Sequence, residues 1–223
     1  MVTIITLYIS AVIFILVSIY INVHKENKDD RFLFYITNSV IFLSVTDIAL
    51  ATGLIFLHYY PFAYAIADIA QGISTGYILL LSFNLSPKPK SYNVIVYVTA
   101  LIYIAELLFY PISPLNPIRF HNIYSYGQEG VLGIYGTVIT LTFFIIIVVN
   151  FLRFAISLKN DIYERNKFIT VALGIFIASI SIGIEESVPN TYTAIIGNFG
   201  YLVGSITALI LLSNIRRNAK VFD

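Results

Sequence analysis

The chain has 223 residues, of which 58% are hydrophobic and 11% charged, and its formal net charge is +1. Soluble domains carry about 25% charged residues, so the composition excludes a soluble domain and predicts a single membrane domain over residues 1–223, located in the cell membrane. The near-neutral charge gives no indication of nucleic-acid binding. The absence of cysteine excludes disulfides and thiolate metal sites, and the composition is typical of thermophiles.

Seven apolar stretches are long enough to cross a bilayer as helices. We therefore predict an all-α fold, a polytopic seven-transmembrane-helix bundle whose short connections make neighbouring helices antiparallel. The first stretch has neither a basic start nor a small-residue cleavage signal, so we expect a retained span and not a signal peptide. The predicted spans cover residues 2–23, 32–57, 62–86, 92–110, 130–155, 168–187 and 191–213.

Lysine and arginine are distributed very unequally between the two ends of these spans. Twelve of the thirteen lie in the first, third and fifth connections and in the tail, and Arg119 alone lies on the other side. Because cytoplasmic loops carry the excess of cationic residues, we predict that the N-terminus is outside and the C-terminus is cytoplasmic.

The longest connection on the predicted outer side runs from Pro111 to Gly127 and contains three prolines. Proline lacks a backbone N–H and disrupts helices, so we expect a stiff, non-helical segment. It either covers the bundle as a lid or forms an ordinary interfacial loop, and the sequence leaves both open.

Small residues recur at the spacing of helix–helix contacts. Gly72 and Gly76 form a G-x-x-x-G pattern in the third span, and Gly200, Gly204 and Ala208 continue the pattern in the seventh. Such rows let helix backbones approach closely in lipid. We therefore expect both rows to be buried against other helices.

Six of the twelve acidic residues lie in the predicted outer half of spans or at their outer ends, almost without cations to pair with. From the helical rise, Asp47 lies about 15 Å below the outer boundary, Asp68 about 9 Å and Glu106 about 6 Å. A carboxylate at such depth is costly unless it is paired, hydrated or protonated, so it usually faces the bundle interior. The six are Asp47, Asp68, Glu106, Glu129, Glu185 and Glu186.

Helical periodicity groups these acids with other polar and small residues, and the faces so formed predict a polar cavity open to the outside. Within it we predict a ligand or proton site formed by Asp47, Asp68, Gln71, Glu106 and Glu185. With no lysine or arginine at their depth, Asp47 and Asp68 should not both be ionised. The alternative is that the shallow acids extend to the interface while Asp47 and Asp68 hold helices together by hydrogen bonds. The stripes are Ser44, Asp47 and Ala51; Asp68, Gln71, Thr75 and Ser82; Thr99, Tyr103, Glu106 and Tyr110; and Gly174, Ala178, Ser181 and Glu185.

The motifs of several functional classes are missing. The seventh span has no lysine for a retinal Schiff base, which excludes a rhodopsin-type pigment. No H-E-x-x-H, G-x-S-x-G or phosphate-binding glycine loop is present. We therefore expect no catalytic activity, no cofactor and no metal site.

The run Tyr163-Glu164-Arg165-Asn166-Lys167-Phe168, an apolar span, Pro189 in a tight turn and a last span ending at Arg216-Arg217 resemble the N-terminal seven-helix region of membrane histidine kinases. In that family the basic turns lead into a cytoplasmic output domain. Only six residues follow Arg217 here, so the resemblance implies a sensory or scaffold module without a kinase. It implies a protein partner at the basic cytoplasmic face, and no binding residues carry over.

Two classes of function follow from these observations. The first is a non-enzymatic receptor-like sensory or assembly module that acts through a cytoplasmic partner. The second is a transporter or channel subunit, either small-solute and cation- or proton-linked or part of a macromolecule-import machine. Spans one to three and five to seven start on the same side of a central fourth, an order that also fits the parallel repeat of SWEET-type transporters. Membrane lipid surrounds the bundle in both cases, and a homo-oligomer remains open.

Overall fold

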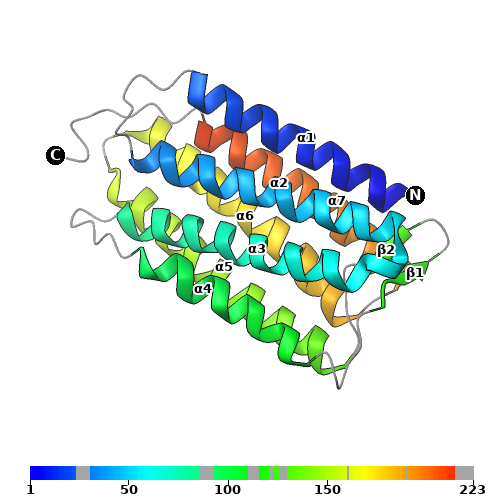
Figure 1. Cartoon of the computed structure of the whole chain (residues 1–223). Helices are drawn as coiled ribbons and strands as arrows, with labels where there is room; N and C mark the ends of the chain where they lie inside the picture. Colours follow the sequence, from blue (N-terminus) through cyan, green and yellow to red (C-terminus); the bar gives the residue numbers. More distant parts are fainter. Residues whose placement is uncertain are drawn as a thin grey trace.

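The computed structural model describes residues 1–23, 31–85, 93–109, 116–120, 123–125, 130–159, 161–188 and 190–213, without the side chains of 186, 187 and 209–213. Seven α-helices form an elongated bundle in this part of the chain (Figure 1). They are α1 (Val2–Val23), α2 (Arg31–Ile55), α3 (Tyr60–Asn84), α4 (Val94–Ile104), α5 (Val131–Ser157), α6 (Ile162–Ser187) and α7 (Thr191–Ser213). Two 3-10 helices, η1 (Leu57–Tyr59) and η2 (Ala105–Phe109), precede α3 and follow α4.

In the part of the chain that the structure describes, five helices are long and apolar enough to cross a membrane, and the segment Val94–Phe109 is a shorter apolar helix. Their outward faces carry large apolar side chains such as Leu16, Ile134 and Val203, whereas serine, threonine and carboxylate side chains are buried between the helices. An apolar exterior around a polar interior is the arrangement expected where the surrounding medium is lipid. The chain therefore has the character of a multi-pass membrane protein.

Each predicted span coincides largely with a helix, although the fourth is α-helical only over Val94–Ile104 and continues as η2. The expected turn before the sixth span was wrong. The charged run before Phe168 was expected to be a turn, but α6 begins at Ile162. The Asp161 side chain accepts a hydrogen bond from the Glu164 backbone N–H at 2.9 Å, which caps the helix. Lys167 then forms an ion pair with Glu164 at 2.9 Å, one helical turn apart.

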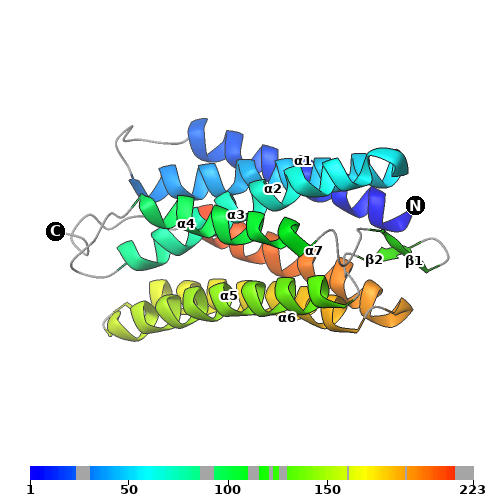
Figure 2. The ribbon, with the colours of Figure 1, turned by 60° about the horizontal axis from the view of Figure 1, so that its bottom comes forward.

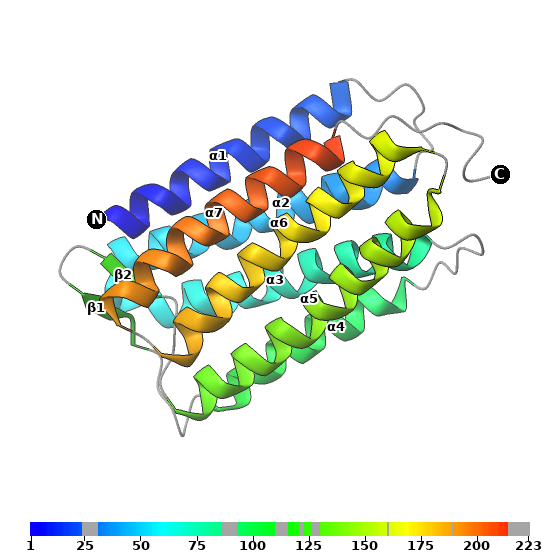
Figure 3. The same cartoon turned by 180° about the vertical axis from the view of Figure 1, so that it is seen from behind.

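The helices form two groups of three that face each other. In one group α2 packs between α1 and α3, and in the other α6 packs between α5 and α7. The groups meet where α1 packs on α7 and α3 packs on α5, while α4 lies outside this ring and packs mainly on α3. Figures 2 and 3 show the two groups from below and from behind. The six helices of the ring thus surround a central space.

The expected contacts of the small residues are confirmed. A Cβ added at Gly76 would lie 2.7 Å from the Cα of Val96 in α4. A Cβ added at Gly204 would lie 2.7 Å from the backbone N of Ala178 in α6. At both crossings a backbone occupies the space that a side chain would need, so glycine sets the helix spacing.

The connection before α5 contains a short antiparallel hairpin, β1 (Ile118–Phe120) and β2 (Ile123–Ser125). The Thr3 hydroxyl donates to the Tyr124 carbonyl at 2.9 Å and accepts from its N–H at 2.8 Å. The Asn198 amide of α7 donates to the same carbonyl at 3.5 Å. The hairpin therefore joins α1 to α7 at one end of the bundle, and the choice between a lid and an interfacial loop stays a prediction.

Candidate functional site

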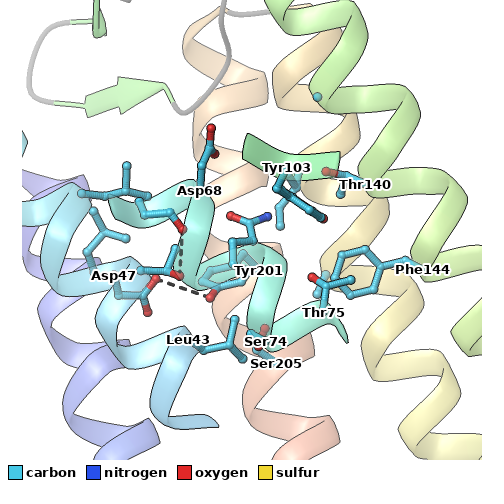
Figure 4. Close-up of a pocket in the computed structure, with 18 of the residues that line it drawn as sticks. Leu43, Asp47, Asp68, Ser74, Thr75, Tyr103, Thr140, Phe144, Tyr201 and Ser205 are labelled. Atoms are coloured by element: carbon cyan, nitrogen blue, oxygen red, sulfur yellow. Dashed lines mark hydrogen bonds between the residues drawn. The ribbon is translucent and has the colours of Figure 1, made fainter. Parts of the chain in front are cut away.

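A partly enclosed cavity lies in the central space between the two groups of helices (Figure 4). Its volume is about 110 Å³, counted as the space that the centres of water molecules can occupy. That is room for several water molecules, or for one small organic molecule. Residues of all seven helices and of η2 line it, and most of the lining is apolar or aromatic, which is usual for a ligand pocket.

Four of the five residues predicted for the ligand or proton site line this cavity together: Asp47, Asp68, Gln71 and Glu106. Helical periodicity identified these four residues because each faces the interior of the bundle. Glu129, Tyr110 and the side chain of Glu186 lie outside the described residues.

Asp47 is the point at which three helices meet in the cavity. Its side chain is 1% exposed. One oxygen, Oδ2, accepts a hydrogen bond from the Ser10 hydroxyl of α1, and the other, Oδ1, accepts from the Tyr201 hydroxyl of α7 at 3.4 Å. The ring of Tyr201 is in turn held edge-on by Phe14, with centroids 6.5 Å apart. These bonds fix the carboxyl group at the cavity wall.

Glu106 lies in η2, closer to the hairpin end of the bundle. It is 4% exposed, and its Oε1 accepts a hydrogen bond from the Tyr64 hydroxyl of α3 at 3.0 Å. On the other side, a Cβ added at Gly136 of α5 would lie 3.6 Å from Oε1. The glycine leaves the carboxyl group uncovered where it meets the cavity.

Asp68 and Asp47 share the cavity, but Figure 4 shows that the Asp68 carboxyl group points away from Asp47, toward the hairpin end. Both side chains are buried. The two residues therefore line one cavity. Its opening to the outside and the coupling of their ionisation stay predictions.

Glu185 does not join the other four, and its expected place in the cavity was wrong. It is fully buried in the contact between α6 and α7, where its carboxyl group fills the space next to Gly197. Ser181 likewise fills the space next to Gly200. The α6 stripe meets a row of glycines on α7, so close packing closes the face that was expected to be open.

The ionisable groups that line the cavity differ from those of the basic end of the bundle in the sign of their charge. Among the lining residues in the described part of the chain, three are acidic and none is lysine, arginine or histidine. Over the same residues, no group of three or more His, Cys, Asp and Glu side chains is placed to hold a metal ion. The cavity therefore combines negative or protonated carboxyl groups with aromatic walls.

Sequence reasoning did not identify the hydroxyl partners Ser10, Tyr64 and Tyr201 or the uncovered face at Gly136. Ser10 is one of several polar residues in an otherwise apolar helix, and the two tyrosines are among 17 in the chain. Their roles depend on which helices lie next to each other, and this is set by the order of the helices around the bundle.

Comparison with protein-family models, with curated proteins and with solved structures gives no match to this chain.

Proposed function

We propose that the protein is a seven-span receptor-like module of the cell membrane that binds a small ligand in the central cavity and acts through a cytoplasmic partner. The observation that carries this proposal is that all seven helices line one cavity. A ligand shifts a conformational equilibrium only by its differential contacts with the two states. One that contacts every helix can bias the arrangement of the whole bundle, as a sensor requires.

The described cations support the proposed orientation. Arg31, Arg153, Lys159 and Arg165 lie at the ends of helices opposite the β1–β2 hairpin, whereas Arg119 lies in the hairpin. Arg153 and Lys159 are exposed. A basic surface at the cytoplasmic end suits an acidic surface on a partner protein.

A reporter fused after Asp223 should be active only as a cytoplasmic reporter, because twelve of thirteen cations lie on that side. An epitope tag inserted after Asn116, in the connection that contains Arg119, is the control and should be accessible from outside intact cells. An extracellular signal at residue 223 would reverse the proposed orientation.

The receptor function predicts that the contents of the cavity change partner binding. Full-length protein should be captured from native membranes together with a defined partner, quantified by mass spectrometry. Gly136→Leu, which fills the cavity beside Glu106, should alter the amount captured. Arg153→Gln with Lys159→Gln should reduce it, because the basic surface loses charge.

Ile134→Leu is the matched control for Gly136→Leu, because Ile134 lies on the same helix with its side chain 68% exposed. It should leave capture unchanged. If the same proteins in the same amounts were captured by all variants, the receptor function would be wrong.

One observation favours a transporter as the second candidate. The cavity lies between two three-helix groups, and carriers built from repeats place the substrate site between halves that rock against each other. Uptake of labelled solute into proteoliposomes, abolished by Gly136→Leu and retained by Ile134→Leu, would favour this class over the receptor.

A further inference from the structure

We propose that the ligand of the cavity is a small organic cation, an amine or quaternary ammonium whose charged group is held at Asp47 and Tyr201 and whose apolar part faces the opposite wall. This inference rests on the proposed ligand-binding function and names the chemical class of the ligand. It is carried by the cavity, by the partners of its carboxyl groups and by the residues across from them.

The surroundings of the carboxyl groups set the sign of the ligand's charge. The groups that hydrogen-bond Asp47 and Glu106 in the described part of the chain are neutral hydroxyls, from Ser10 and Tyr201 on the first and Tyr64 on the second. An ionised carboxylate buried without a cation costs several kcal/mol. The carboxyl group avoids this cost by holding a proton while the cavity is empty, and a cationic ligand can take the place of that proton. A neutral ligand gains no charge-assisted contact, and an anionic one adds repulsion.

The cavity lining favours an organic cation over a metal ion. Ca²⁺ requires about six to eight oxygen ligands, and the described residues offer no cluster of acidic or histidine ligands. Aromatic rings, in contrast, are abundant: Tyr60, Tyr64, Tyr103, Phe144 and Tyr201 all line the cavity. Alkylammonium groups bind favourably over such rings through cation–π attraction.

The two sides of the cavity set the orientation of the ligand. Figure 4 shows Asp47 with Tyr201 on one side of the cavity and Thr75 with Phe144 on the other. The cavity volume of about 110 Å³ accepts a molecule of several heavy atoms. The ligand that fits has a charged group at one end and a short apolar body.

The test uses purified full-length protein in lipid nanodiscs and three probes: tetramethylammonium, choline and butylammonium. The neutral isostere of choline, 3,3-dimethylbutan-1-ol, is the matched ligand control. Calorimetry should show saturable binding of at least one cation, with the isostere bound about ten- to hundredfold more weakly, because it lacks the charge-assisted contact. Asp47→Asn should weaken cation binding by a similar factor.

Glu185→Gln is the matched protein control, because Glu185 is an equally buried acid that does not line the cavity. It should bind the cation as the wild type does. If Asp47→Asn does not fold, Gly136→Leu should abolish binding while leaving every carboxyl group in place.

Three results would overturn the inference: none of the three cations binds, the neutral isostere binds equally well, or sodium or potassium ions stabilise the protein as much as choline. These outcomes are distinct from failure of the proposed function. Cation binding without any change in partner capture would refute the receptor function alone, and capture that responds to Gly136→Leu without cation binding would refute the ligand class alone.

Discussion

Gly204→Leu should destabilise the protein by about 3 kcal/mol or more, beyond the usual cost of overpacking a core, and leave little folded material in detergent. The reason is that α6 and α7 touch through their backbones at this point. A Cβ at residue 204 would lie 2.5 Å from the Gly174 carbonyl oxygen and 2.7 Å from the Ala178 N. No side-chain rearrangement relieves a contact with backbone atoms, so the helices must separate. The measurement is the folded fraction by gel filtration and by SDS denaturation.

Val203→Leu is the control for this substitution. Val203 precedes Gly204 on the same helix, but its side chain is 57% exposed on the outward face. Adding one methylene there should change stability by less than about 0.5 kcal/mol. Wild-type stability of Gly204→Leu would mean that α6 and α7 do not pack through this row.

The course of the helices could be predicted from the sequence because each depends on a local property, the length of an apolar run. The start of α6 could not, since the charges of residues 161–167 fit a turn and a capped helix equally well. The cap formed by Asp161 decided between them. The β1–β2 hairpin also depends on partners distant in sequence, Thr3 and Asn198.

In the candidate site, too, some features follow from the local sequence and others from the neighbouring helices. Helical periodicity alone placed Asp47, Asp68, Gln71 and Glu106 on interior faces, and they line one cavity. Periodicity also placed Glu185 on a helix face made of small and polar residues. Whether such a face borders a cavity or packs against another helix depends on which helix lies next to it. Here the glycines of α7 allow this face of α6 to pack directly against α7.

Asp47 should carry a proton at neutral pH when the cavity is empty. The Ser10 hydroxyl has one hydrogen, yet its oxygen lies within reach of two acceptors, the Leu7 carbonyl at 2.9 Å and Asp47 Oδ2. Both contacts are satisfied if the carboxyl group is protonated and Oδ2 donates to the Ser10 oxygen, while the Ser10 hydroxyl donates to Leu7. Protonation also removes the cost of a buried charge whose hydrogen-bond partners, in the described part of the chain, are neutral hydroxyls.

Infrared spectroscopy of the full-length protein in nanodiscs measures this directly, through the C=O stretching band of a protonated carboxyl group. The band should lose intensity in Asp47→Asn and keep it in Arg153→Gln, which alters charge at the far end of α5. Asp68→Asn tests whether its neighbour in the cavity holds a second proton. Adding the cation should also diminish the band, because an ammonium group at Asp47 releases the proton to solvent. If neither aspartate substitution altered the band at neutral pH, the proton site would have to be abandoned, and the cation would have to enter a cavity whose carboxylates are already ionised.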